Sequence, residues 1–120
     1  MPEQSFGKRI KELRVQLKLP QQVLAAEVSI DAGYLSKIEA GKVPPPSEKV
    51  IGNLAQVLHA DKDELMVLAG KSPKDIEPII TEDVRIPGIL RRARGLNAKD
   101  WEKVEKYIEQ LKSGKRDHRL

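Results

Sequence analysis

The stretch from Pro20 to Gly41 constrains the fold of this chain most, because it holds two short helical patterns separated by a tight turn. Over residues 21–28, apolar side chains recur at helical spacing with small alanines between them, which predicts a helix packed closely against a neighbour. Asp31 stands where a carboxylate caps a second helix, and Gly41 lies where glycine commonly follows a helix end. The sequence therefore predicts a helix, a turn at residues 29–30, and a second helix.

Further helical patterns flank this stretch on both sides. The first is an amphipathic helix expected over residues 5–18, where apolar side chains recur at spacings of 4, 3 and 4: Phe6, Ile10, Leu13 and Leu17. Ser47 and Asp61 stand at the cap positions of two later helices, the second of which is expected to end near Gly70. Five helices in the first seventy residues predict a small all-α domain.

Composition limits the classes of protein that the chain can represent. At 120 residues it has room for one compact domain with a small appendage, which argues against a large enzyme cleft. The formal charge of +4 is unevenly placed, because residues 1–70 hold 9 Lys/Arg and 9 Asp/Glu whereas residues 71–120 hold 13 and 9. Bulk charge therefore argues only weakly for nucleic acid, and local arrangement must supply any phosphate-binding surface in the first part.

Several residue types that catalysis or export would need are missing. The chain has no cysteine, which removes disulfides and thiolate metal sites and favours a reducing compartment. The first residues lack the apolar core of a signal peptide, and no run approaches the ~18 apolar residues of a membrane span. His59 and His118 lie far apart without motif partners, and no glycine-rich phosphate loop occurs. We expect no enzyme activity, no metal, no cofactor and no membrane association.

Several motifs in register connect the first part of the chain with a known family. They are F-G-x-x-I-x-x-L-R, L-P-Q-Q-x-L-A, Y-L-S-K-I-E-x-G-K, P-S and L-A. From Phe6 to Gly70 the chain resembles the helix-turn-helix domain of the phage repressor and Cro type, which is widespread in bacterial transcription regulators. The resemblance implies a five-helix lambda-repressor-like domain over residues 1–70 whose third helix enters the major groove of double-stranded DNA. It also implies a cytoplasmic location at the bacterial nucleoid.

The resemblance places the DNA contacts on the second and third helices. Gln21 matches the glutamine that opens the second helix in such domains and contacts the DNA backbone. Lys37 is expected to donate to a guanine edge or a phosphate, although any surface helix shows polar residues on its free face. The expected DNA-binding residues are Gln21, Gln22, Ala32, Gly33, Tyr34, Ser36, Lys37 and Lys42.

The sequence also departs from the family pattern. Ala32 and Gly33 occupy positions where relatives often place base-contacting side chains, so direct base readout is expected to be sparse and DNA shape to matter more. Ser29 lies in the turn where many relatives have glycine, and a positive φ would strain it. Arg14 and Glu39 match a partly buried ion pair that joins the first and third helices, so we expect the two to be energetically coupled.

Residues 71–112 are expected to form a helical dimerisation segment, followed by a flexible tail over residues 113–120. Pro78 and Pro87 divide the first part of this segment into short helices. From Asn97 to Lys112, apolar residues step by 3, 4 and 3 like a coiled-coil seam that is too short to be stable alone. We favour homodimerisation over packing within the chain, through the side chains of Trp101, Val104, Tyr107, Ile108 and Leu111.

The densest basic cluster in the chain consists of Arg91, Arg92 and Arg94. It is either a phosphate contact or, as we favour from the sequence, a solvated helix face. Taken together, the pattern predicts a homodimeric transcriptional repressor that binds a palindromic operator. Three alternatives of the same fold are an antitoxin with a toxin partner, a repressor cleaved by a metallopeptidase partner, and a protein-binding module that resembles a coactivator.

Overall fold

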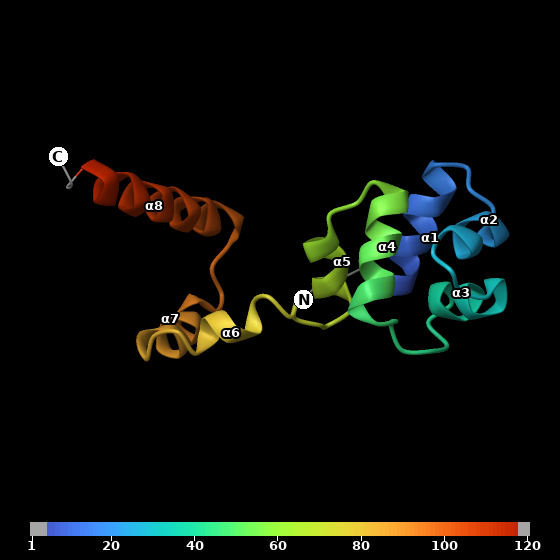
Figure 1. The fold of residues 1–120 in the computed structure, drawn as a ribbon, viewed down its shortest axis with the longest axis horizontal. Coiled ribbons are helices and arrows are strands. Elements are labelled where there is room, and N and C mark those ends of the chain that lie inside the picture. Colours follow the sequence, from blue (N-terminus) through green and yellow to red (C-terminus); the bar gives the residue numbers. More distant parts are fainter. Residues whose placement is uncertain (1–4, 118–120) are drawn as a thin grey trace. The chain divides into compact units, whose positions relative to one another are not determined.

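The computed structural model describes residues 5–117 and divides the chain into two compact units, Met1–Glu77 and Pro78–Leu120 (Figure 1). Every regular element within residues 5–117 is a helix, so the predicted all-α class is confirmed. None of these helices is both long and apolar enough to cross a membrane. The expected tail from residue 113 falls partly outside the described residues, because the description ends at residue 117.

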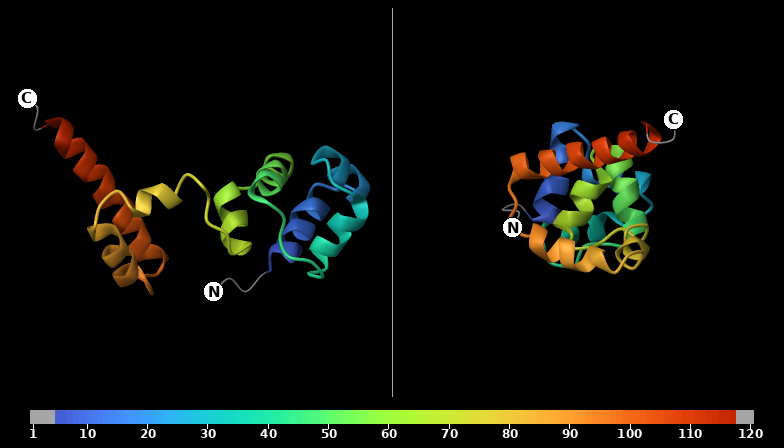
Figure 2. Two further views of the ribbon diagram at one scale, coloured as in Figure 1. Left: turned by 60° about the horizontal axis from the view of Figure 1, so that its bottom comes forward. Right: turned by 90° about the vertical axis from the view of Figure 1, so that its left-hand side faces the viewer.

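The first unit is built from helices that pack around α4. Its elements are α1 (Phe6–Gln16), α2 (Gln21–Glu27), α3 (Ala32–Glu39), α4 (Glu48–Leu58) and α5 (Lys62–Leu68). Helix α4 contacts α1, α2 and α5, whereas α3 packs on α1 and α2 (Figures 1 and 2). The helix, turn and helix predicted between residues 20 and 41 thus lie beside each other at one side of the bundle.

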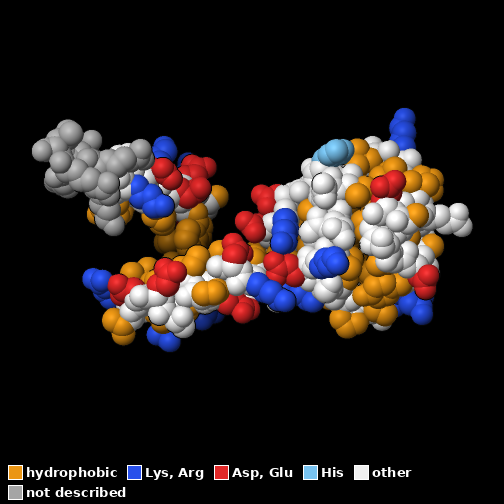
Figure 3. Space-filling model, viewed as in Figure 1, with side chains coloured by type: hydrophobic (Ala, Val, Ile, Leu, Met, Phe, Trp, Pro, Cys, Tyr) orange, Lys and Arg blue, Asp and Glu red, His pale blue; other side chains and the backbone are white. Residues whose placement is uncertain are grey.

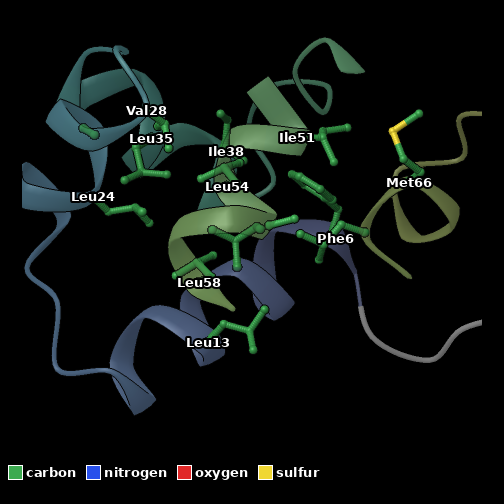
Figure 4. Close-up of a cluster of buried hydrophobic side chains, with 14 residues drawn as sticks. Phe6, Leu13, Leu24, Val28, Leu35, Ile38, Ile51, Leu54, Leu58 and Met66 are labelled. Atoms are coloured by element: carbon green, nitrogen blue, oxygen red, sulfur yellow. The ribbon is translucent and has the colours of Figure 1, made fainter. Parts of the chain in front are cut away.

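One apolar core fixes these helices relative to each other. Helices α1 to α5 each contribute at least one side chain with no exposed area, among them Ile10, Leu24, Leu35, Ile51, Leu54 and Leu65. Figure 4 shows Leu35 and Ile38 of α3 in the same cluster as Leu54 of α4. Burying one such side chain stabilises the fold by roughly 1.5–3 kcal/mol. The core therefore holds α3 firmly against the bundle and leaves its opposite face free.

Side-chain caps start α4 and α5 where the sequence predicts them. Ser47 Oγ accepts from the backbone N–H of Val50 at 3.4 Å, and Asp61 Oδ1 accepts from the N–H of Asp63 at 2.8 Å. The predicted carboxylate cap of α3 is wrong, because the Asp31 side chain makes no cap hydrogen bond. The backbone carbonyl of Asp31 accepts from Leu35 N–H at 3.0 Å instead, so the main chain alone begins α3.

The second unit consists of two short helices and one of 20 residues, and its described residues form no buried core. Helix α6 (Glu77–Ile80) spans the division between the units and precedes α7 (Arg85–Ala93) and α8 (Ala98–Asp117). As predicted, Pro78 and Pro87 lie in the first turns of separate short helices. No side chain between residues 78 and 114 is buried, and Ile108 is 46% exposed. This unit therefore presents apolar side chains that its own chain does not cover.

Both boundaries of the second unit differ from the sequence-based expectation. The first unit extends to Glu77 rather than to Gly70, because Glu48 holds the intervening segment. Glu48 Oε1 accepts from the Lys74 N–H at 3.1 Å, and Lys62 Nζ lies 3.0 Å from Glu48 Oε2. These contacts lower the pKa of Glu48, the hydrogen bond from Lys62 most of all. At the other end, α8 continues to Asp117, beyond the expected end at residue 112.

A reciprocal capping box begins α8 at Asn97, the residue from which the sequence predicts this helix. The Asp100 N–H donates to Asn97 Oδ1 at 2.9 Å, and the Asn97 N–H donates to Asp100 Oδ2 at 3.3 Å. The neighbouring Leu96 and Trp101 both line an apolar groove formed by α7 and α8, which fits a hydrophobic staple across this helix start. Neighbouring residues in the sequence therefore determine how the chain enters α8.

Candidate nucleic-acid interface

Helix α3 is divided into a buried face and an exposed face. Leu35, Ile38 and Glu39 are buried, which orients the helix on the bundle. Gly33, Ser36 and Lys37 lie on the opposite side and are exposed. An exposed polar face on a short helix held by a rigid core has the form of a recognition helix.

The remaining predicted DNA-binding residues border this face. Tyr34 is 37% exposed and lies at the edge beside Ile38, while Ala32 is half-buried at the other edge. Gln22 of α2 and Lys42 after α3 are exposed, whereas Gln21 is half-buried. Lys42 also ends the α3 turn through its backbone, since its N–H donates to the Lys37 carbonyl at 2.9 Å. The structure thus brings the expected residues to α2, α3 and the residues directly after α3.

Glu39 joins three helices through a buried hydrogen-bond network. Arg14 of α1 donates to both carboxylate oxygens, from Nε to Oε2 at 2.7 Å and from Nη2 to Oε1 at 2.9 Å. Gln21 Nε2 at the start of α2 donates to Glu39 Oε1 at 3.0 Å. The Glu39 side chain is only 3% exposed and that of Arg14 11%. The network therefore ties the positions of α1, α2 and α3 to one carboxylate.

The remaining buried polar groups of this network also have hydrogen-bond partners. Arg14 Nη1 donates to the carbonyl of Leu19 at 2.8 Å, directly before α2. Its hydrogen bond to Glu39 raises the pKa of Arg14 above the ordinary value, so the guanidinium stays charged at any pH the fold meets. No described, buried side-chain nitrogen or oxygen lacks a hydrogen-bond partner. A fully paired ion pair of this kind fixes geometry, because removing either partner alone leaves a buried charge.

The link between Gln21 and Glu39 has no counterpart in the sequence pattern. The sequence predicts a phosphate anchor at Gln21 and pairs Glu39 with Arg14 alone. In the structure one Nε2 hydrogen of Gln21 is used within the fold, and a carboxamide carries two. The second hydrogen remains for a ligand, with the side chain held in place in advance. Residues eighteen positions apart give no periodic signal, so only the packed structure shows this contact.

The turn between α2 and α3 is strained at Ser29. Its φ is +59°, in the left-handed region that favours glycine. The N–H of Ile30 donates to the Ala25 carbonyl at 2.9 Å, and the Ser29 N–H donates to the Ala26 carbonyl at 3.2 Å, which together form a Schellman motif. Helix α2 thus ends in a fixed hydrogen-bonded turn, although the expected glycine is absent.

The apolar side chains of α7 and α8 line a groove of about 520 Å³. Three residues of the predicted dimerisation seam, Trp101, Val104 and Ile108, contribute to it. Tyr107 and Leu111 are exposed without lining it. Figure 3 shows the apolar surface between α7 and α8. Among the residues that the structure describes, no cluster of His, Asp and Glu is arranged to hold a metal ion.

Comparison with known families decides what kind of domain this is. A family described as "Helix-turn-helix domain" matches residues 5–68, which is more than half of the chain. The chain belongs to this helix-turn-helix family. Its first unit is a phage repressor and Cro-type (XRE-like) helix-turn-helix domain, as its motifs predict.

Two relatives come from Bacillus subtilis (strain 168). The uncharacterized HTH-type transcriptional regulator RghRB is 40% identical over 65 residues, which cover 54% of this chain and 47% of RghRB. The HTH-type transcriptional repressor RghR is 36% identical over 67 residues, which cover 56% of this chain and 50% of RghR. The chain thus spans about half the length of the curated relatives it matches.

A solved structure shares the fold over a longer stretch. One chain from a complex of the SinR protein with the SinI protein can be superimposed on this chain. The match covers 90% of this chain and 98% of that chain. The TM-score is 0.50 and the sequence identity 24%, so this likeness concerns the fold alone.

Proposed function

We propose that this chain is a sequence-specific, double-stranded DNA-binding transcriptional repressor that binds a palindromic operator as a homodimer. The observation that carries the proposal is the rigid presentation of α3. The Glu39 network fixes α3 against α1 and α2, and the core buries Leu35 and Ile38. The opposite face, with Gly33, Ser36 and Lys37, is free to enter a major groove.

In this proposal the residues along α2 and α3 have separate roles. Gln21 and Gln22 contact the DNA backbone at the start of α2, and Lys42 contacts it after α3. Lys37 and Ser36 donate to base edges, whereas Ala32 offers only its methyl group, for example to a thymine methyl. Because few side chains in this set donate hydrogen bonds to bases, DNA shape supplies part of the specificity. The name of the relative RghR, an HTH-type transcriptional repressor, supports repression rather than activation.

The homodimer in this proposal forms through the second unit. Its uncovered apolar side chains, led by Trp101 and Ile108, are available to a second copy. Two copies related by a two-fold axis would place their α3 helices about 34 Å apart, one turn of DNA. Such a protein works where the bacterial chromosome lies, in the cytoplasm at the nucleoid.

Binding to the DNA upstream of the protein's own coding sequence tests the proposal. We expect a two-fold symmetric footprint and a dissociation constant of roughly 10⁻⁸ M or lower at physiological salt, at least ~10³-fold below that for a random duplex. Micromolar binding without preference over the random duplex would refute the regulator function.

A pair of matched variants separates base readout from charge in this experiment. Lys37→Ala on α3 should weaken operator binding by about 1–3 kcal/mol and reduce the preference over random DNA. Lys11→Ala removes the same charge from the exposed face of α1 and should leave the preference unchanged. Equal effects of the two substitutions on preference would show that Lys37 does not read bases.

A further inference from the structure

We propose that α7 contacts the phosphate backbone of duplex DNA through an arginine saddle, defined as Arg85, Arg91 and Arg92 around Gly88. This rests on the proposed function, because it adds a second DNA-contacting surface to the same regulator. In a helix, residues three and four positions apart are neighbours on the surface. Arg85 lies three residues before Gly88, and Arg91 and Arg92 lie three and four residues after it. The three cations therefore surround one position.

The centre of the saddle is open. A Cβ atom added at Gly88 would meet no other atom within 4 Å, so a phosphate group can approach the helix backbone there. Ile86, Ile89 and Leu90 lie on the other side of α7, where Ile89 and Leu90 line the apolar groove. The helix thus carries an apolar face toward α8 and, around Gly88, a face with the three arginines. Arg92 lies at the border between them and also lines the groove, and the exposed Val84 lies four residues before Gly88.

The cations of the saddle are available for a ligand. Within residues 5–114, Arg91 and Arg92 form no ion pair, and both are exposed. Arg85 is paired with Asp83, with 2.6 Å between Nη2 and Oδ2, yet its side chain remains 79% exposed. Asp83 holds Arg85 in place and weakens its charge. Arg91 and Arg92 are therefore the main phosphate contacts.

The charge of the two units favours this assignment. Met1–Glu77 contains 11 Lys/Arg and 11 Asp/Glu, so the helix-turn-helix unit is neutral. Pro78–Leu120 contains 11 Lys/Arg and 7 Asp/Glu, which gives the whole excess of +4. Affinity for duplex DNA comes largely from cations that replace counterions at phosphates. The unit with the excess charge is the one suited to supply this sequence-independent part.

A second copy of the chain is the competing partner for these arginines. Helix α8 carries acidic side chains at Glu102, Glu105 and Glu109, three and four residues apart. However, residues 98–114 contain four Lys and four Asp/Glu, so this part of α8 is neutral as a whole. A dimer would double the positive excess instead of cancelling it. The excess therefore favours a polyanion over a second protomer.

The test compares two double variants of the full chain that each lose two positive charges from the second unit. Arg91→Gln/Arg92→Gln removes the saddle, and Lys103→Gln/Lys106→Gln is the control on α8. Binding to operator and random duplexes is measured over a range of salt concentrations. The slope of log K against log salt should become shallower by about 0.9 for each lost phosphate contact, or about 3.6 for four contacts in a dimer.

The saddle variant should lose affinity for operator and random duplex by the same factor, because phosphate contacts carry no sequence information. Arg91→Lys/Arg92→Lys keeps the charge and should restore the slope. A slope equal to that of the control variant would overturn the proposal. If that equal slope comes with a higher dimer dissociation constant by light scattering, the arginines serve the contact between copies.

The two proposals can fail separately in this experiment. If the wild-type chain shows no preference for operator DNA, the proposed function fails, and the slope on random duplex still decides the role of the saddle. If operator preference is present and the saddle slope does not change, only the saddle proposal fails.

Discussion

At Gly7 the backbone of α1 lies directly against the end of α3. A Cβ atom at this position would lie 2.2 Å from the carbonyl oxygen of Ile38 and 2.9 Å from that of Glu39. Both atoms belong to backbone that the core and the Glu39 network hold in place, so neither can move aside cheaply. The missing side chain of one residue thus sets how closely α3 packs on α1.

Gly7→Ala should destabilise the domain, although alanine normally stabilises a helix interior by about 1 kcal/mol relative to glycine. Overpacking against fixed atoms commonly costs about 1–3 kcal/mol, and the contact here is with backbone, so we expect a net loss of roughly 2 kcal/mol. Urea unfolding followed by circular dichroism measures this change.

Gly52→Ala is the matched control for this prediction, since Gly52 is also a helical glycine. Its added Cβ would lie 3.6 Å from Cε of the flexible Lys62 side chain, an ordinary contact. We expect this variant to gain up to about 1 kcal/mol. A Gly7→Ala protein that is as stable as the Gly52→Ala protein would contradict the close approach of α1 and α3.

Some contacts of single residues can be predicted from the sequence, and others cannot. Arg14 and Glu39 are named by their match to a family motif, and the structure places them in contact. The donation from Gln21 to Glu39 depends on how α2 and α3 pack, and no local pattern contains it. The missing side-chain cap at Asp31 is likewise a matter of rotamer choice, which sequence position does not determine.

At the scale of elements, helices α1 to α5 share one way of ending. Each is followed by a left-handed residue, at Lys18, Ser29, Gly41, His59 and Gly70. In every case the N–H of the next residue donates to the carbonyl five positions earlier, as in the donation from Ala60 to Ala55 at 2.9 Å. The sequence indicates the turn at Ser29 and the helix ends at the two glycines, but not the left-handed conformation of Lys18 and His59, because their φ is set by the Schellman hydrogen bonds.

These helix ends predict opposite effects for two exchanges. His59→Gly should stabilise the domain by about 0.5–1 kcal/mol, because a left-handed conformation strains a residue that carries a Cβ. Gly70→Ala should destabilise it by about 1 kcal/mol, since nothing lies near the added Cβ and the positive φ is the sole obstacle. Thermal unfolding of the wild type and both variants measures the two changes in stability. If both variants shift the melting temperature in the same direction, the left-handed geometry shared by these helix ends is contradicted.

Elements with strong local signals are the ones that the sequence predicts well. The capping box at Asn97 marks the start of α8 because both partners lie within one turn. The end of α8 was expected at Lys112, whereas the helix continues to Asp117 through polar residues that carry no apolar pattern. The first unit extends past Gly70 because Glu48 binds the backbone of Lys74, a contact between distant positions.

At the scale of the whole molecule, the two units differ in how completely they bury their apolar side chains. The first encloses Leu24, Leu35 and Leu54, whereas the second leaves Trp101 44% and Ile108 46% exposed. A unit of this size seldom buries enough surface to be stable without help. Covering α7 and α8 with a second copy would remove this surface from water and make folding of the unit depend on protein concentration.

Ile108→Asp should therefore convert the protein to a monomer, because a carboxylate in the centre of the apolar seam would have to be desolvated in the dimer. Operator binding should weaken by about 10²-fold or more, since two linked helix-turn-helix units no longer bind as one. Gln110→Asp introduces the same charge on the polar side of α8 and should leave both properties unchanged. Light scattering reports the mass, and an Ile108→Asp protein that remains dimeric would show that the seam of α8 does not join the copies.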